Sequence, residues 1–225
     1  MNEFPQRAWV EELLVEFVPH NPFRALFLFQ GLPSVPCDSG FLFYLAERFN
    51  VSVFYPRYPG TWESKGLLDE LLPSLNKLMR KRIFQDCYTG EKYSFSFKRR
   101  FGIGHSFGGM VVLKLLEEEK LDAGVALAAP WEINNLKDHL GFVKRCFGEA
   151  YRFKHPKLFS IDPTTIKQLP HLLIYSKDDE VVPLKEVEPF IQGLNVRIVD
   201  GYGHGGKRKL IKRYSRTIAR LFSDG

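Results

Sequence analysis

The amino-acid sequence predicts an α/β fold in which a mostly parallel central sheet carries helices on both faces. Short apolar runs alternate with longer amphipathic segments along most of the 225 residues. Strands separated by helices pair in parallel, because a helical crossover returns the chain to the same edge of the sheet. The composition agrees: 44% hydrophobic and 26% charged residues are typical of a soluble globular protein. Twenty Phe, nine Tyr and three Trp provide enough core material to disfavour disorder.

The first hundred residues read as strands, helices and one extended segment. Alternation over 11–18 predicts a strand, and the continuous apolar run over 25–29 predicts a strand buried on both faces. Asp38 or Ser39 can cap a helix over 39–49. The other elements expected here are a strand over 51–55, a helix over 67–81 and a hairpin or extended segment over 83–98.

The second half repeats the alternation, with one interruption. We expect strands over 100–103, 123–129, 171–175 and 196–199, and helices over 106–119, 183–193 and 207–222. The stretch 131–169 is polar and helical in pattern and lies between two strands. We interpret it as a small helical cap insertion over the carboxyl edge of the sheet, where such folds bind ligands. The alternative is a helical excursion that covers one face. No linker divides the chain, so residues 1–225 are expected to form a single domain.

Charge and cysteine usage bear on partners and compartment. The net charge is +6, and the segment 206–225 accounts for all of it, with seven basic residues and one acid. A role with nucleic acid or an anionic membrane would therefore rest on this segment, although a solvated helix face is the more common use of such charge. The widely spaced Cys37, Cys87 and Cys146 form no C-x-x-C pair, which disfavours a metal or disulfide scaffold. With no signal-like N-terminus and no membrane-length apolar run, we expect a cytoplasmic protein.

The strongest chemical signal is Gly104-His-Ser-Phe-Gly108, which follows an apolar strand and precedes a helix. A nucleophile on a tight strand-to-helix turn has strained backbone angles, so the residues two before and two after it must be small. The pattern favours Ser106 as a nucleophile whose hydroxyl lies near a helix N-terminus. A glycine-rich packing turn is the alternative.

Serine needs a base, and the chain has six histidines. His105 adjoins the serine and should point elsewhere, while His171 begins a buried strand and is expected to be structural. His204 lies in a glycine-rich loop between the last strand and the last helix, and there it completes the order Ser, Asp, His. The acid should follow the strand over 171–175, where Asp178, Asp179 and Glu180 stand side by side. Spacing alone does not choose among these three.

Together these motifs resemble the α/β-hydrolase superfamily, and within it the small serine esterases and serine aminopeptidase-like hydrolases. The resemblance covers about residues 23–222 and implies the α/β-hydrolase fold. Its D-x-x-V-P pattern matches Asp179 to Pro183, which assigns Asp179 as the acid and leaves Asp178 in reserve. Its early oxyanion loop matches Gln30-Gly31-Leu32, although many members have His at the position of Gln30.

The resemblance implies a catalytic triad of Ser106, Asp179 and His204, with the backbone N–H groups of Leu32 and Phe107 as the oxyanion hole. The expected activity is that of a carboxylesterase-like serine hydrolase, which cleaves a small-molecule ester through an acyl-enzyme on Ser106, with no cofactor and no metal. Thioesterase or small peptidase activity are variants of the same triad. A non-catalytic binding module on this fold is the alternative from another class. Dehalogenase or cofactor-free oxygen chemistry is a third possibility, and the serine disfavours the dehalogenase.

Two tryptophans are candidates for substrate binding. Trp131 follows Pro130 at the end of a strand, and Trp62 lies in a loop expected to leave the same edge of the sheet. Either ring can line a pocket or pin its own loop by packing.

Overall fold

The structure, a computed structural model, describes residues 4–32, 34–132 and 160–224. The chain divides into two compact units. Within the described residues, the first unit comprises 4–28 and 34–100, and the second comprises 29–32, 101–132 and 160–224.

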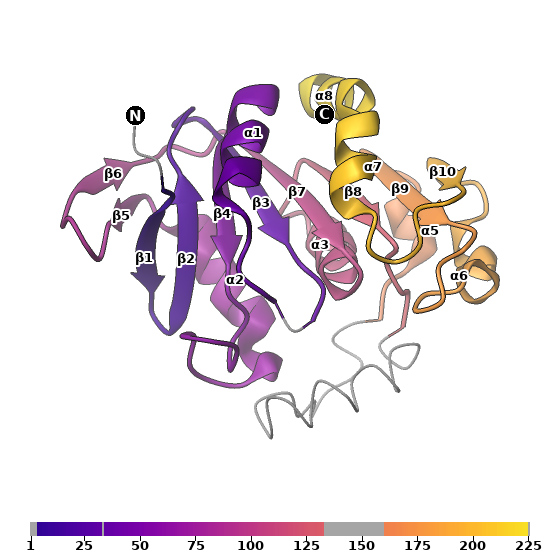
Figure 1. Cartoon of the computed structure of the whole chain (residues 1–225), viewed down its shortest axis with the longest axis horizontal. Coiled ribbons are helices and arrows are strands. Elements are labelled where there is room, and N and C mark those ends of the chain that lie inside the picture. Colours follow the sequence, from indigo (N-terminus) through magenta and orange to yellow (C-terminus); the bar gives the residue numbers. More distant parts are fainter. Residues whose placement is uncertain (1–3, 33, 133–159, 225) are drawn as a thin grey trace. The chain divides into compact units, whose positions relative to one another are not determined.

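The first unit is built on four strands in the order β1-β2-β4-β3. Strands β3 and β4 are parallel, whereas β1 pairs with β2 and β2 with β4 in antiparallel fashion. Helices α1 and α2 lie on opposite faces of these strands (Figure 1). The elements are β1 (Gln6–Val10), β2 (Leu13–Val18), β3 (Arg24–Phe29), α1 (Ser39–Phe49), β4 (Ser52–Pro56), the 3₁₀ turn Leu68–Glu70, α2 (Leu71–Arg80), and the hairpin of β5 (Ile83–Gln85) and β6 (Lys92–Ser94).

Local chemistry explains the ends of α1, and packing explains the core of this unit. The Asp38 side chain accepts a hydrogen bond from the Phe41 N–H at 3.1 Å, and Asn50 ends the helix in a left-handed conformation. Phenylalanine rings from several strands meet in the core, for example Phe54 of β4 and Phe84 of β5 with ring centroids 5.0 Å apart.

A buried ionic cluster lies in the same unit. The Glu16 carboxylate accepts from the guanidinium of Arg57 at 2.9 Å and from that of Arg7 at 3.0 Å. Arg57 is fully buried and Glu16 is 4% exposed. Removing one partner of such a pair destabilises the fold, because the remaining charge would be buried without a counter-ion.

The second unit contains four parallel strands in the order β7-β8-β9-β10. In β7, Phe101 stacks on Phe222 of α8 with centroids 4.4 Å apart, while Gly102 faces Val112 of α3. Neighbouring strand residues point to opposite faces, so α3 and α8 cover opposite faces of these strands. The elements are β7 (Arg99–His105), α3 (Phe107–Glu117), β8 (Ala123–Leu127), α5 (Pro163–Ile166), β9 (His171–Ser176), α6 (Leu184–Ile191), β10 (Val196–Val199), α7 (Lys207–Arg213) and α8 (Ser215–Asp224).

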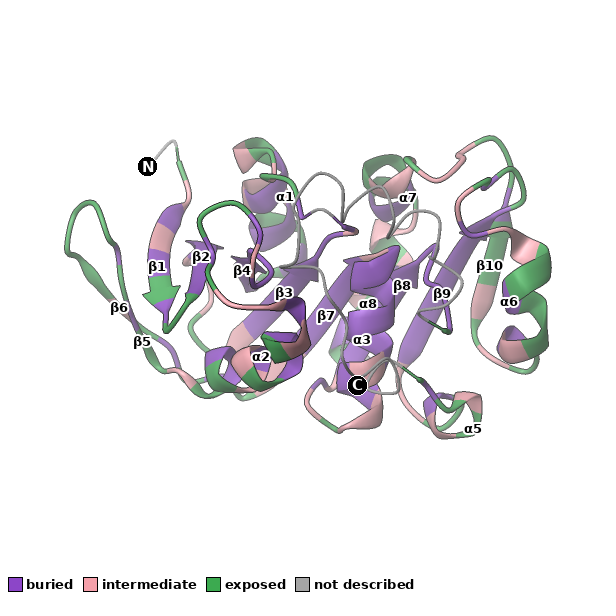
Figure 2. Cartoon of the chain, turned by 90° about the horizontal axis from the view of Figure 1, so that it is seen from below, coloured by how far each residue is buried: buried purple, intermediate pink, exposed green. Residues whose placement is uncertain are grey.

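The strands of the second unit are deeply buried, as Figure 2 shows for β7, β8 and β9. Helix α3 is apolar around most of its circumference, and nine of its residues are buried. A helix of this kind belongs to the interior of a domain. It holds the residue that precedes it, Ser106, at the end of a rigid strand.

The fold class predicted from sequence is confirmed: the strands are mostly parallel and helices cover both faces in each unit. The helix over 39–49 and the strand over 196–199 have the expected bounds. Two expectations were wrong in detail. The strand expected over 11–18 begins at Leu13, because a turn at Glu11 joins it to β1, which was not foreseen. The last helix is divided at Tyr214 into α7 and α8.

The cap expected over 131–169 lies largely outside the described residues. Of this stretch, the structure describes 131–132 and 160–169, and within it α5 forms one short helical turn. Among the described residues, none of the helices has the length and apolar character that spanning a membrane requires.

Candidate active site

Ser106 occupies a strained turn between β7 and α3. Its φ of 54° and ψ of −125° lie outside the regions that L-residues prefer. A Cβ on Gly104 would come within 2.0 Å of the Gly108 carbonyl oxygen, and a Cβ on Gly108 within 2.3 Å of the Phe29 carbonyl oxygen. Only glycine fits at these two positions, which is the steric requirement that the sequence pattern indicated.

Asp179 and His204 meet although 25 residues separate them. The His204 Nδ1 lies 2.9 Å from one carboxylate oxygen of Asp179 and 3.0 Å from the other. They come from the loop after β9 and the loop after β10, which leave the same edge of the parallel strands (Figure 1). The contact uses Nδ1 and leaves Nε2 as the ring nitrogen that can exchange a proton with a substrate or nucleophile.

The Asp179 carboxylate is held in its charged form. Burial by itself raises its pKa, but the hydrogen bond from His204 and those from the backbone N–H groups of Val182 and Val181 outweigh burial, so the pKa lies below the ordinary value. A carboxylate that stays ionised orients the imidazole and stabilises it when it becomes protonated.

Asp178 has a different set of contacts. Its carboxylate accepts hydrogen bonds from the Gly201 N–H at 3.1 Å, from the Gly203 N–H at 3.0 Å and from the Ser176 hydroxyl. The Ser176 hydrogen bond is the main reason that the pKa of Asp178 is lowered. Of the two adjacent aspartates, Asp179 contacts the imidazole, whereas Asp178 holds the loop that carries His204 in place.

His105 contacts both the backbone and the ring of His204. Its Nε2 lies 2.6 Å from the His204 carbonyl oxygen, and the two rings are 4.7 Å apart at an angle of 51°. Burial, and then the charges of His204 and Lys207, lower the pKa of His105 to about 3. The ring is therefore neutral at pH 7, and its Nε2–H donates to the carbonyl. Sequence reasoning set this residue aside and did not foresee its contact with the loop of His204.

His171 is structural, as expected. Its Nδ1 lies 2.7 Å from the Leu169 carbonyl oxygen, and its Nε2 accepts from the Asn195 N–H at 2.9 Å. Burial lowers its pKa. The two ring nitrogens thus join the segment before β9 to the loop before β10, and neither contacts Ser106.

The predicted oxyanion loop lies against the nucleophile. A Cβ on Gly31 would be 3.0 Å from the Ser106 Cβ and 3.5 Å from its Oγ, so this backbone passes directly beside the hydroxyl. Phe107 is the first residue of α3, where backbone N–H groups have no partner within the helix. Leu32, which follows Gly31, and Phe107, which follows Ser106, belong to the same unit, and their role as oxyanion donors stays a prediction. Within the described residues, no hydrogen bond joins the Ser106 hydroxyl to His204, a contact that often tightens only when substrate is bound.

The two tryptophans differ in their surroundings. Trp131 is fully buried, stacks on Phe190 with centroids 5.8 Å apart and donates from its indole N–H to the Tyr175 hydroxyl at 3.2 Å. These contacts give its ring a packing role. Trp62 belongs to the first unit and is 52% exposed on a turn with positive φ. A substrate contact by either tryptophan stays a prediction.

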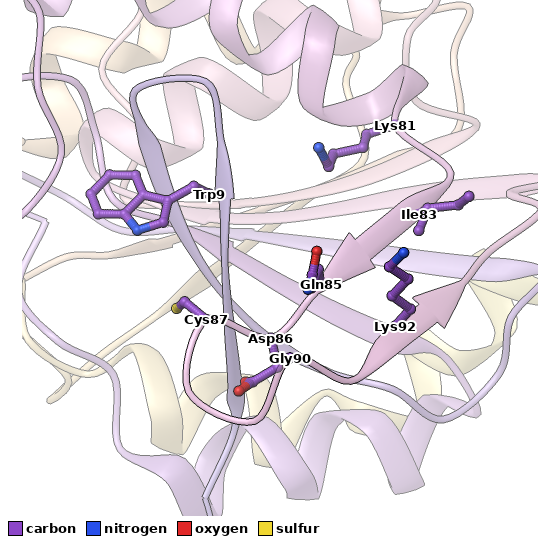
Figure 3. Close-up of a pocket in the computed structure, with 8 residues that line it drawn as sticks. All are labelled: Trp9, Lys81, Ile83, Gln85, Asp86, Cys87, Gly90 and Lys92. Carbon is purple, nitrogen blue, oxygen red and sulfur yellow. The ribbon is translucent and has the colours of Figure 1, made fainter.

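A separate cavity of about 440 Å³ lies in the first unit, beside β1 and the β5–β6 hairpin (Figure 3). It contains a thiol, that of Cys87, which donates to the Arg7 carbonyl oxygen at 2.9 Å. Burial raises the pKa of this thiol, so it is not an activated nucleophile. The cavity therefore offers no rival centre for covalent chemistry. No cluster of three or more His, Cys, Asp or Glu side chains able to hold a metal occurs in 4–32, 34–132 and 160–224.

Comparisons with known proteins support the fold. No protein-family model matches the sequence, and no curated protein does. Solved structures do match over nearly the full length. The 2-hydroxy-6-oxo-6-phenylhexa-2,4-dienoate hydrolase of Rhodococcus sp. strain RHA1 is 18% identical, with a TM-score of 0.69 over 98% of each chain.

Two further solved structures agree. An esterase of Pyrococcus furiosus is 16% identical, with a TM-score of 0.67 over 98% of this chain and 91% of the other. A meta-cleavage product hydrolase of Pseudomonas fluorescens IP01 is 15% identical, with a TM-score of 0.64 over 99% and 98%. With mostly parallel strands, helices on both faces and a strained serine turn, this chain has the α/β-hydrolase fold that its sequence motifs resemble.

Proposed function

We propose that this protein is a serine hydrolase that cleaves carboxylic ester-type bonds through an acyl-enzyme on Ser106. One observation carries the proposal. The Asp179 carboxylate lies within hydrogen-bond distance of Nδ1 of His204. Both residues belong to the compact unit that holds Ser106 on a strained, glycine-flanked turn. A binding module has no need of an ionised carboxylate, an oriented imidazole and a strained serine together.

The chemistry proceeds in two steps. The Ser106 Oγ attacks the substrate carbonyl carbon while Nε2 of His204 accepts the hydroxyl proton. The oxyanion that forms accepts hydrogen bonds from the backbone N–H groups of Leu32 and Phe107. The carbon–oxygen bond to the leaving group then breaks, and the departing alcohol takes the proton from His204.

Water completes the cycle. His204 accepts a proton from water, whose oxygen attacks the carbonyl carbon of the acyl-enzyme. The bond to Ser106 breaks, the carboxylic acid leaves, and Ser106 regains its proton from His204. Asp179 stabilises the imidazolium in both steps without taking its proton. The esterase and hydrolase names of the structural neighbours support hydrolytic chemistry, although identities of 15–18% leave the substrate open.

Covalent labelling tests the proposal most directly. We expect wild-type protein to react with a fluorophosphonate probe and to hydrolyse p-nitrophenyl acetate, and Ser106→Ala to lose both while remaining folded. Removal of a triad nucleophile lowers kcat by about a million-fold in enzymes of this kind. Ser96→Ala is a matched control, because Ser96 is exposed and lies in the first unit. Full activity in Ser106→Ala would refute the assignment, and a folded wild-type protein that does not label would favour the binding module.

A substrate panel then separates the variants of the proposal. Ester, thioester, amide and lactone substrates distinguish a carboxylesterase from a thioesterase or small peptidase. The panel should include 2-hydroxy-6-oxo-6-phenylhexa-2,4-dienoate, which the Rhodococcus neighbour is named for. The ratio of kcat/KM values ranks the substrates, because it measures relative transition-state binding.

A further inference from the structure

Gln30 is the one departure from the family pattern in the oxyanion loop. Its side chain is only 5% exposed, and it directly precedes the glycine whose backbone lies beside Ser106. A buried amide has a high cost unless it is hydrogen-bonded, so its partner decides how this part of the loop is held.

One hydrogen-bond partner of the Gln30 side chain comes from the far end of the chain. The Lys207 ammonium donates a hydrogen bond to Oε1 of Gln30, across 177 positions of sequence. Lys207 is the first residue of α7 and follows His204 by three positions. The contact therefore links the loop of the predicted oxyanion hole to the loop of the predicted base.

Backbone packing fixes the other side of the same loop. The glycine positions 31 and 108 allow the segment 29–31 to rest on the Ser106 turn, since added Cβ atoms would lie 3.0 Å from Ser106 Cβ and 2.3–2.6 Å from the carbonyl oxygens of Phe29 and Gln30. The Ser106 turn packs against one side of this loop, and the charge-assisted hydrogen bond from Lys207 holds the other. The peptide group that presents the Leu32 N–H therefore has little freedom to rotate.

We propose that Lys207 and Gln30 form a positioning pair that holds the oxyanion loop in register with Ser106. The proposal rests on the serine hydrolase function proposed above and deepens it. Neither side chain is a catalytic residue, because each acts through the backbone of the loop. The Lys207 ammonium also lies near the His105 imidazole: after burial and His204, its charge is the next contribution that lowers the pKa of His105.

The test is a double-mutant cycle on the full chain. Lys207→Met keeps the stem and removes the donor, and Gln30→Leu removes the acceptor while leaving α7 untouched. Each should lower kcat for p-nitrophenyl acetate about 10- to 100-fold with little change in KM, because a displaced oxyanion donor weakens transition-state binding. The rate of fluorophosphonate labelling should fall in proportion. The double variant should lose about as much kcat as the more impaired of the two single variants, because both substitutions remove the same contact.

Conservative and control variants complete the experiment. Lys207→Arg keeps a donor of similar reach and should retain most of the wild-type kcat. Lys209→Met removes an exposed lysine from the same helix and should leave kcat unchanged. If Lys207→Met lowers the melting temperature, the kcat of the Gln30→Leu variant alone decides the outcome. Unchanged kcat in both single variants, or fully additive losses in the double variant, overturns the positioning pair.

Labelling of the wild-type protein separates the two levels of inference. A wild-type protein that does not react with the fluorophosphonate overturns the proposed function and the positioning pair with it. A reactive wild-type protein whose Lys207→Met and Gln30→Leu variants label at the same rate overturns the positioning pair alone.

Discussion

Replacing His105 should make the protein less sensitive to mild acid. In the folded state the pKa of His105 is lowered from 6.5 to about 3, with burial as the largest cause. Below pH 6.5 the unfolded chain takes up a proton on this ring and the folded chain does not. Protonation therefore stabilises the unfolded state as pH falls. The contribution of the neutral His105 ring to the free energy of unfolding is complete only above the unfolded pKa of 6.5 and is lost as pH falls below it.

The size of the effect follows from the shift. Each pH unit between the two pKa values changes the free energy of unfolding by about 1.4 kcal/mol. Between pH 7 and pH 5, His105 should therefore remove about 2 kcal/mol of stability, an upper value because the ring is partly exposed and water screens its charge. A loss of this size is a large share of the stability of an ordinary domain.

Urea unfolding of wild type and His105→Gln at pH 7 and pH 5 measures the effect. The substitution is expected to lower stability at pH 7, so the quantity of interest is the change with pH in each protein. Titrating groups distant from His105 contribute equally to both proteins and cancel in the comparison. We expect the wild type to lose more stability than His105→Gln, by up to about 2 kcal/mol. Equal losses would show that the His105 ring titrates normally and would refute the account of its neutral state.

Two further predictions concern the loop of His204 and the core of the first unit. Asp178→Ala removes the acceptor of the Gly201 and Gly203 N–H groups, so kcat for p-nitrophenyl acetate should fall about 10- to 100-fold through misplacement of the imidazole, and an unchanged kcat would contradict the role of this loop contact. Glu16→Ala leaves the fully buried Arg57 guanidinium without its carboxylate, which should lower the free energy of unfolding by about 3–5 kcal/mol in urea titrations, whereas a loss below about 1 kcal/mol would show that the charge reaches water.

Sequence reasoning reached the elements whose signals are local. The helix of α1 has its bounds because Asp38 caps it and Asn50 ends it, and both signals stand next to the helix in the chain. The turn at Ser106 was visible because its steric requirement falls on neighbours two positions away. Strand β1 was missed because Glu11, which has a φ of 53°, turns the chain without a Gly, Pro or Asn to mark the place.

The finer parts of the candidate site depend on distant contacts. Asp178 and Asp179 are adjacent and chemically identical, so spacing alone does not choose between them. In the structure, Asp178 accepts from the Ser176 hydroxyl and from loop N–H groups, whereas Asp179 contacts His204. The contact between Gln30 and Lys207 joins residues 177 positions apart, so no local pattern indicates it. Spacing can show that an acid or a lysine is available, whereas the fold determines what it touches.

The cramped glycines around Ser106 also limit how this protein can be redesigned. Any side chain at position 104 or 108 would collide with main-chain carbonyls, which cannot move without dismantling the strand-to-helix junction. A mutagenesis library aimed at new selectivity should therefore leave both sites unchanged and vary the loops that follow β9 and β10 at positions other than Asp178, Asp179 and His204.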